Sequence, residues 1–450
     1  MKQKTFHLTS LGCAKNNVDS DSMVQLLERD GFHVVLTPQK ASILIVNTCG
    51  FIESARKESY KVLHALAKSK KPGQLLIAAG CLTQRYADDV AHQVPGVDGI
   101  LGTRRWMDIV EVVRDLRKKH YHSTKSALRP NPLYHLPETP TMGTDEQGVL
   151  RAYIAGSSAF LKIADGCRRP CAFCAIPLIK GTAVSRPVET ILDEARRLRE
   201  MGVRELVLIA QDTTDYGHDL GMKDGLATLL EKLIVSVPDI DWLRIMYAYP
   251  GSVTDRLIDL MASHPQVLPY LDIPLQHASP SILGSMHRPS NVDWVRRTVS
   301  KMRARIPDLS IRTTFIVGYP GETEEDFQVL MDFVNEIRFD RVGAFQFSFE
   351  PGTSSEALGD PIPRRVKETR YQKLMELQQS ISLQINQSYI GKILEVLIEG
   401  ENNGIAIGRS YRDAPEIDGL VLVEGRAKIG SIIPVRITGA LEYDLTGIPG

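Results

Sequence analysis

The first part of the chain alternates short apolar runs with amphipathic stretches. The apolar runs predict β-strands at Thr5–Leu11, Phe32–Leu36, Ile43–Asn47 and Leu75–Ala79. Apolar residues at helical spacing predict helices at Val18–Arg29 and Ala55–Ala67. Strands that alternate with helices are typical of a parallel sheet, because each helix carries the chain back to the same edge. Residues 1–118 are therefore expected to form an open parallel α/β domain.

A second, longer α/β pattern occupies the centre of the chain. The polar, proline-containing residues 119–150 are predicted to be a linker that leads into it. Strands are expected at Phe160–Ala164, Glu205–Ala210, Leu243–Tyr249, Tyr270–Ile273, Ser310–Val317 and Arg341–Phe347. Helices are expected at Val188–Met201, Leu226–Val237, Thr254–Ala262, Val292–Ile306 and Glu324–Ile337. This pattern predicts a partial (βα)6 barrel over residues 151–388, with its site at the carboxyl ends of the strands.

The pattern changes again near Gly391, where short strands and glycine-rich turns replace the helices. Strands are expected at Ile393–Ile398, Gly404–Gly408, Gly419–Val423 and Ile432–Ile437. Such a pattern predicts a small antiparallel β-barrel of the OB-like kind over residues 389–450. A long amphipathic helix, Arg364–Ser388, is expected to join it to the central barrel. The predicted fold class is thus α/β with a C-terminal β-barrel.

Composition narrows the class of protein without identifying a function. The 450 residues are 43% hydrophobic and 24% charged, which is ordinary for a globular protein. Lysine plus arginine equals aspartate plus glutamate at 54 each, so nothing indicates a generally basic nucleic-acid binder. The first residues contain no apolar signal core, and no apolar run approaches membrane-spanning length. We expect a cytoplasmic monomer that does not contact a membrane.

Three of the six cysteines, Cys167, Cys171 and Cys174, lie within eight residues. Three thiolates on one loop can hold three irons of an iron–sulfur cube and leave the fourth iron open for catalysis. A structural zinc site would need four ligands and the usual paired C-x2-C units, which are absent. A disulfide pair would fit a small secreted chain better than this one. The spacing therefore favours a catalytic iron–sulfur cluster.

The other three cysteines follow predicted strands of the N-terminal domain. Cys13 follows the first strand, and Cys49 and Cys81 end the apolar runs that begin at Ile43 and Leu75. A single cysteine at a strand end is usually a small buried side chain. Three at equivalent positions can converge, because the carboxyl ends of parallel strands meet at one edge of the sheet. We therefore favour a second cluster over core packing.

Together these motifs resemble a known family. The Cys167 loop, with Phe173 before its last cysteine, closely resembles the signature loop of radical S-adenosylmethionine (SAM) enzymes. With Gly12-Cys13, Asn47-Thr-Cys49, Gly80-Cys81 and the terminal β-barrel, nearly the whole chain resembles the methylthiotransferases. The resemblance implies a cluster domain, a radical SAM barrel and a TRAM domain in series, with two 4Fe-4S clusters and SAM as cofactors. It also implies that a methylthio group replaces the hydrogen of an unactivated C–H bond.

Several polar and glycine residues are candidates for binding the cofactor. Gln211 ends the second barrel strand, and Gln276-His277 follows the fourth. Gly318 and Gly321 follow the fifth strand and would let the backbone approach the adenosyl group of SAM closely. The cofactor-binding candidates are Phe173, Gln211, Gln276, Gly318 and Gly321. His277 has no second histidine at ligand spacing, and Thr323 with Asp326 predicts a helix capping box.

The choice of substrate rests on a few segments and on charge. Residues 10–20, 211–213, 270–279 and 407–419 are similar to the branch of the family that modifies an aspartate of small-subunit ribosomal protein S-twelve at its β-carbon. One departure is Ala14, where proline was expected. Residues 391–450 hold nine acidic and six basic residues, a net charge of −3, which suits a basic protein better than RNA. Glu416 and Asp418 are expected at that surface.

Two alternatives stay open from the sequence, besides a purely structural zinc protein that would require stoichiometric zinc after anaerobic purification. One is a tRNA adenosine methylthiotransferase with the same chemistry. The other is a non-catalytic iron–sulfur electron carrier or redox sensor, which would need a full set of cluster ligands. The expected partners are ribosomal protein S-twelve, free or on its subunit, together with a reductant and a sulfur donor. No catalytic residue beyond the cluster ligands is predicted.

Overall fold

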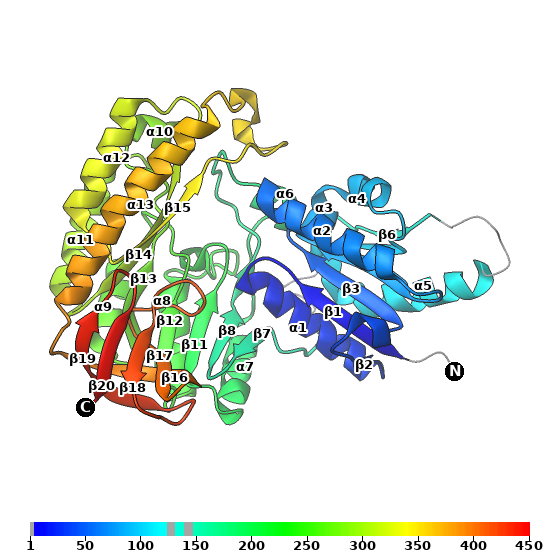
Figure 1. Ribbon diagram of the computed structural model, residues 1–450, viewed down its shortest axis with the longest axis horizontal. Helices are drawn as coiled ribbons and strands as arrows, with labels where there is room; N and C mark the ends of the chain where they lie inside the picture. Colours follow the sequence, from blue (N-terminus) through cyan, green and yellow to red (C-terminus); the bar gives the residue numbers. More distant parts are fainter. Residues whose placement is uncertain (1–3, 124–130, 139–146) are drawn as a thin grey trace.

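The N-terminal domain is a parallel sheet with helices on both faces. The computed structural model describes residues 4–123, 131–138 and 147–450, and its sheet has the order β2-β1-β3-β4-β5-β6. The strands are β1 (Thr5–Ser10), β2 (His33–Val34), β3 (Ile43–Thr48), β4 (Leu75–Gly80), β5 (Gly99–Gly102) and β6 (Leu133–His135). Every residue of β3 and β4 is buried, as expected for central strands covered on both faces. Helices α1 (Ala14–Arg29) and α5 (Ile109–Ser123) pack with one face, and α2 (Glu53–Ser69) with the other (Figure 1).

The predicted linker contains part of a helix and a strand within its described residues. Helix α5 continues to Ser123, and β6 pairs with β5 at the edge of the N-terminal sheet. Most of the remaining predicted linker, residues 124–130 and 139–146, lies outside the described residues. Strands β5 and β6 are absent from the sequence prediction because they are short and weakly apolar. The N-terminal sheet therefore has two more strands than the sequence pattern indicated.

The central module confirms the predicted partial barrel. Six parallel strands lie in the order β15-β14-β13-β12-β11-β8, and the antiparallel β7 (Ala152–Ala155) extends the sheet beyond β8. The six are β8 (Ser158–Lys162), β11 (Glu205–Ile209), β12 (Trp242–Ile245), β13 (Val267–Asp272), β14 (Ser310–Val317) and β15 (Arg341–Gln346). The helices are α7 (Val188–Glu200), α8 (Gly225–Ser236), α9 (Asp255–Ser263), α11 (Val292–Arg305) and α12 (Glu324–Ile337). The capping box of Thr323 and Asp326 at the start of α12 is also confirmed.

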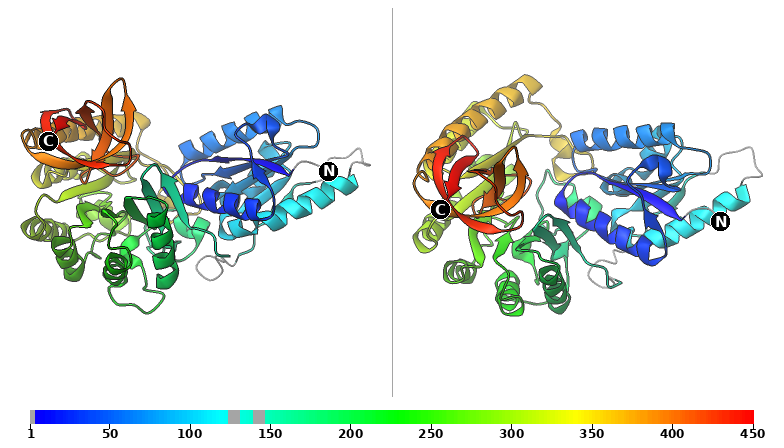
Figure 2. Two further views of the ribbon diagram at one scale, coloured as in Figure 1. Left: turned by 90° about the horizontal axis from the view of Figure 1, so that it is seen from below. Right: turned by 60° about the horizontal axis from the view of Figure 1, so that its bottom comes forward.

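The C-terminal module is a closed five-stranded barrel, reached through α13 (Arg364–Gln387). Its strands are β16 (Ile393–Asn402), β17 (Ile405–Ser410), β18 (Val421–Glu424), β19 (Ile432–Ala440) and β20 (Leu445–Pro449). Strand β20 was not predicted. The prediction of a fully antiparallel barrel is wrong at one pairing, because β18 and β20 run parallel. Figure 2 shows this barrel, in orange and red, packed against the central module.

Charged residues of the C-terminal barrel point into the central module. The side chain of Asp418 is only 2% exposed and accepts a hydrogen bond from Tyr270 Oη at 2.6 Å. Arg341 Nη2 donates to Asp413 Oδ1 at 2.5 Å, and both side chains are buried. The expectation that Asp418 lies on a free acidic surface is therefore wrong, whereas Glu416 is exposed. Asp413 and Asp418 thus help to dock the C-terminal barrel onto the central module.

One apolar cluster belongs to all three modules. It joins Ala14 and Val18 of α1, Val207 and Ile209 of β11, and Leu397 of β16, among other buried side chains. The interior of the partial barrel is thus sealed by the C-terminal barrel and by the first helix of the N-terminal domain. Among residues 4–123, 131–138 and 147–450, no helix has the length and apolar character needed to cross a bilayer.

Candidate functional site

All six cysteines line one cavity of about 450 Å³ between the N-terminal domain and the central barrel. Cys13 precedes α1, Cys49 directly follows β3, and Cys81 directly follows β4. The carboxyl ends of β1, β3 and β4 meet at one sheet edge, so three cysteines far apart in sequence converge as predicted. The second trio reaches the same cavity from a loop that leaves β9 (Ala164–Asp165).

Glycines allow the first trio to approach closely. A Cβ on Gly12, whose φ is +98°, would lie 2.9 Å from Cys49 Cβ. A Cβ on Gly50 would lie 2.6 Å from Leu82 Cα, next to Cys81, and 2.6 Å is shorter than any normal carbon contact. A Cβ on Gly80 would lie 2.4 Å from Asn47 Oδ1. The absence of side chains at these positions lets the three cysteine segments pack against one another.

The second trio is held by backbone hydrogen bonds to neighbouring loops. Cys167 N donates to Gly181 O at 3.0 Å, and Cys174 N donates to Cys171 O at 3.1 Å. Two groups also reach the sulfur atoms. Arg169 N donates to Cys167 Sγ at 3.4 Å, and Arg288 Nη1 donates to Cys171 Sγ at 3.5 Å. Hydrogen bonds of this kind stabilise thiolate sulfur, which is the form that binds iron.

Burial disfavours the charged form of several of these thiols in the metal-free chain. It raises the pKa of Cys81 and of Cys174 to about 12, and that of Cys167 to about 11. A buried thiol becomes a thiolate when a metal takes the place of its proton. Within the part of the chain that the structure describes, no group of His, Cys, Asp or Glu side chains is placed to hold a single metal ion. Ligands of an iron–sulfur cube bind different irons and need not converge on one point.

The trios therefore fit iron–sulfur clusters by donor chemistry and by placement. Each trio supplies three sulfur donors on one side of a shared cavity. Glycines give the first trio close backbone packing, and hydrogen bonds to sulfur support the second. The sulfur donors and the enclosed apolar lining are typical of cluster sites.

Three of the five cofactor-binding candidates lie at the cavity. Phe173, Gln211 and Gln276 line it, and Gln276 has a positive φ of 75° that aims this segment toward β14. Gly318 and Gly321 are not among its lining residues. The amide of Gly318 instead donates to the carboxylate of Glu322.

His277 is buried behind the cavity. Its Nδ1 accepts a hydrogen bond from Ser279 N at 2.9 Å, and burial lowers the pKa of its imidazole to about 4. It is therefore neutral at physiological pH.

The basic residues of the cavity and its tyrosines were not predicted from the sequence. Lys15 lies two residues after Cys13, and its Nζ is 3.3 Å from the centre of the Tyr247 ring on the opposite wall. Arg288 lies 4.4 Å from the centre of the Tyr249 ring. No carboxylate of the described residues forms an ion pair with Lys15. The position of Lys15 two residues after Cys13 was a signal in the sequence that could have indicated this role.

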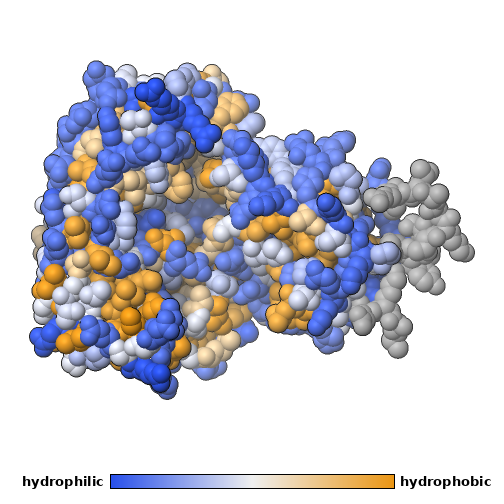
Figure 3. Space-filling view, in the orientation of Figure 1, coloured by the Kyte–Doolittle hydropathy of each residue, from blue (hydrophilic) through white to orange (hydrophobic). Residues whose placement is uncertain are grey.

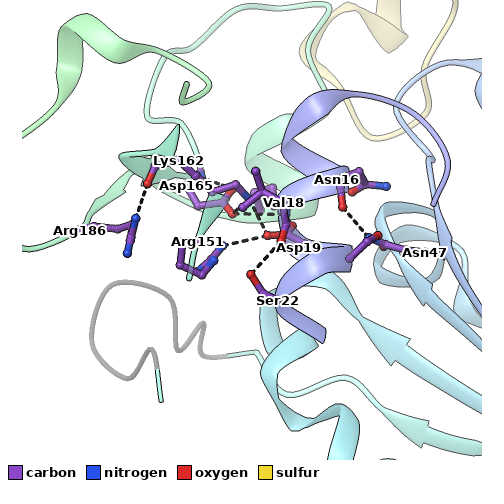
Figure 4. A network of polar contacts seen from close by, with 12 residues as sticks. Asn16, Val18, Asp19, Ser22, Asn47, Arg151, Lys162, Asp165 and Arg186 are labelled. Carbon is purple, nitrogen blue, oxygen red and sulfur yellow. Dashed lines mark hydrogen bonds and ion pairs between the residues drawn. The ribbon is translucent and has the colours of Figure 1, made fainter. Parts of the chain in front are cut away.

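A buried charge network lies beneath the cavity and joins the two modules (Figure 4). Asp19 Oδ1 accepts from Lys162 Nζ at 2.6 Å and from Arg151 Nη2 at 2.9 Å, and Asp19 Oδ2 accepts from Lys180 Nζ at 2.8 Å. Asp165 Oδ2 accepts from Lys162 Nζ at 2.8 Å. Burial alone would raise the pKa of both carboxyls, but Lys162 and Lys180 outweigh it and hold each pKa below its usual value. Both carboxylates are charged at neutral pH.

Comparison with protein families matches all three modules. Residues 5–102 match the family described as "Uncharacterized protein family UPF0004", residues 161–334 the radical SAM superfamily, and residues 390–449 the TRAM domain. A curated relative from Roseiflexus sp. (strain RS-1), named "Ribosomal protein uS12 methylthiotransferase RimO", is 46% identical over 98% of this chain and 96% of its own length. A relative of the same name from Chloroflexus aurantiacus is 47% identical over 98% and 99%. The chain belongs to the RimO family of methylthiotransferases.

Solved structures with much lower sequence identity have a similar fold to this member of the RimO family. The radical S-adenosylmethionine methyltransferase TsrM from Kitasatospora setae has a TM-score of 0.56 and 13% identity, covering 87% of this chain and 77% of its own. The cobalamin-dependent radical enzyme OxsB has a TM-score of 0.50 and 12% identity, covering 84% of this chain and 56% of its own. At such identities the likeness concerns the fold alone. It supports an α/β domain joined to a radical SAM barrel.

Proposed function

We propose that this protein adds a methylthio group to the β-carbon of an aspartate of ribosomal protein uS12, using SAM and two 4Fe-4S clusters. The observation that carries the proposal is that both cysteine trios line one cavity. A carrier of electrons would not need two open cluster sites facing a common space. Relatives that match 98% of this chain bear the name of the uS12 enzyme, which favours this substrate over tRNA.

Cys167, Cys171 and Cys174 would hold the cluster that binds SAM, and Cys13, Cys49 and Cys81 the auxiliary cluster. When bound, these groups supply the radical, the sulfur and the methyl group of the reaction. The chain's own residues enclose the cavity and orient the groups bound in it. Tyr247, Tyr249 and Phe345 line the space between the trios and limit the entry of water. Holding the reacting groups together is the main contribution that a protein makes to such chemistry.

Two cations of the cavity suit anionic ligands. Lys15 Nζ faces the Tyr247 ring, and Arg288 donates to Pro274 O and to Cys171 Sγ. A carboxylate gains more from such a cation in an enclosed site than in water, because the local dielectric is lower. We assign Lys15 to the β-carboxylate of the target aspartate. SAM has a carboxylate of its own, and we assign Arg288, on the barrel side, to it.

The C-terminal barrel has a surface suited to a protein substrate. Leu420, Leu441 and Tyr443 are 37%, 47% and 42% exposed. Figure 3 shows apolar side chains gathered over this barrel, at the lower left of the molecule. Modules that bind RNA usually present basic residues to the phosphates. An apolar surface of this kind favours a protein partner.

Competition between substrates tests the proposal. Anaerobically reconstituted enzyme is offered uS12 and tRNA together, and mass spectrometry locates the added methylthio group. We expect a methylthio group on an aspartate of uS12 and unmodified adenosine. Modified adenosine with unmodified uS12 would refute the substrate assignment. SAM cleavage without modification of either substrate would refute the reaction.

A further inference from the structure

Two buried carboxylates cross between the N-terminal domain and the central barrel, one in each direction. Asp19 of α1 is the first. Its side chain is 1% exposed, and it accepts hydrogen bonds from Arg151, Lys162 and Lys180, all on the barrel side. Moving Asp19 away from these three cations would leave its carboxylate buried and unpaired, which is costly and therefore opposes movement at this contact.

Glu350 is the second, and it reaches in the opposite direction. It follows β15 of the barrel, and its side chain is 2% exposed. It pairs with Arg56 of α2 and with Arg85 Nη1, the latter at 2.9 Å. Arg85 Nη2 also donates to Pro351 O at 2.7 Å. Both arginines belong to the N-terminal domain, so the two carboxylates form reciprocal contacts.

Each contact involves segments that carry the cysteines. Asp19 lies six residues after Cys13 on the helix that begins at Ala14. Its partner Lys180 lines the cavity, and Lys180 and Lys162 both pair with Asp165, two residues before Cys167.

Glu350 acts on the other two cysteines of the first trio. Arg85 ends the short helix that starts at Cys81. Its Nη1 donates to Gly50 O at 3.1 Å, directly after Cys49. Both contacts therefore connect the backbone that holds the first trio to the barrel that holds the second.

We propose that Asp19 and Glu350 are positioning residues that fix the distance between the two cysteine trios. The inference rests on the proposed function, because it gives that distance a purpose. Sulfur must reach the carbon radical before the radical is quenched, and a misplacement of about 1 Å can reduce the rate of a positioned reaction about a hundredfold. SAM cleavage needs only the barrel trio, so it should be insensitive to this distance.

The test uses Asp19→Asn and Glu350→Gln, which keep side-chain size and remove the charge. For each variant we expect 5′-deoxyadenosine production within about twofold of the wild type, with at least a tenfold fall in methylthio product per 5′-deoxyadenosine, as positioning effects of this size allow. Pulsed dipolar EPR of the reduced holoenzyme should show a broader distribution of distances between the clusters. Small-angle X-ray scattering of the metal-free chain should show a larger radius of gyration.

Glu28→Gln is the matched control for Asp19, because Glu28 lies on the same helix and is exposed. Glu356→Gln is the control for Glu350, because Glu356 is exposed and lies six residues away. Both controls should match the wild type. Two independent variants on separate contacts guard against the misfolding of either one.

An unchanged product ratio in both variants would overturn the proposal. A parallel loss of product and 5′-deoxyadenosine would also overturn it, because it would indicate a general structural defect. If the wild-type enzyme makes no methylthio product, the proposed function fails instead. The EPR and scattering measurements need no substrate and would still report on the two contacts.

Discussion

Replacing Asp418 by asparagine tests the docking of the C-terminal barrel. The Asp418 carboxylate accepts from Tyr270 Oη at 2.6 Å and from Ala414 N at 2.9 Å, and it lies 3.3 Å from Arg312 Nε. Asparagine keeps one acceptor oxygen and loses the charge. Breaking a buried ion pair costs about 3–5 kcal/mol when the partner is left alone. Arg312 keeps Asp272 at 3.0 Å, so the loss is nearer that of one charged hydrogen bond, about 1.5–3 kcal/mol.

The assay is urea unfolding of the metal-free protein at pH 7, followed by circular dichroism. Glu416→Gln is the matched control, because Glu416 is two residues away and exposed. We expect a lower urea midpoint for Asp418→Asn, and a midpoint unchanged from the wild type for Glu416→Gln. Equal midpoints for the two variants would refute the reasoning. So would weaker uS12 binding by Asp418→Asn at unchanged stability, because that result would make Asp418 a substrate contact.

Three further predictions concern the cavity and its surroundings. Gly50→Ala should displace Cys81, because the new Cβ would overlap the backbone of Leu82. The amount of iron bound by the N-terminal trio should therefore fall. The control Gly400→Ala, which has open space around the new Cβ, should retain its iron. Lys15→Gln should raise the KM for uS12 by about tenfold, because losing a charged contact costs roughly 1.4 kcal/mol of binding free energy. Lys15→Arg keeps the charge and should restore part of the lost affinity. An unchanged KM in Lys15→Gln would show that Lys15 does not bind the substrate. The pKa of His277 is about 4 in the folded chain and 6.5 in the unfolded chain, so the unfolded chain binds more protons between these two pH values. The free energy of unfolding of the metal-free chain should therefore fall as the pH drops from 6.5 to 4. It should fall less steeply in His277→Gln.

Sequence patterns predicted the elements with a clear apolar pattern. Strand β4 is a continuous apolar run, β14 alternates buried and partly buried residues along most of its length, and α12 has both a capping box and an apolar face. The convergence of Cys13, Cys49 and Cys81 followed from the topology of parallel strands. Strands β5 and β6 were missed because a run of three or four residues gives too little periodicity to detect.

The contacts between modules could not be predicted in the same way. Asp19 and Lys180 are 161 residues apart, and neither sits in a pattern that marks a charge as buried. Asp418 looked like an exposed acid because charged residues usually are. Cavity residues such as Lys15 and Arg288 acquire a role only when two domains face each other. Sequence indicated the cysteines that line the site, and the packing of domains determined what surrounds them.

The inward charges of the C-terminal barrel limit how the chain can be divided. Arg409 of the C-terminal barrel pairs with Glu205 of the central barrel at 2.6 Å. Arg244 of the central barrel donates to Tyr411 O of the C-terminal barrel at 2.7 Å. Removing residues 391–450 would take one partner from each of Glu205 and Arg244, whose mutual ion pair at 2.6 Å would remain. It would also open the interior of the partial barrel to water. The C-terminal barrel is thus an integral part of the fold and cannot be removed without disturbing the central barrel. A chimera that exchanged it between relatives would need the matching residues of the central barrel transplanted with it.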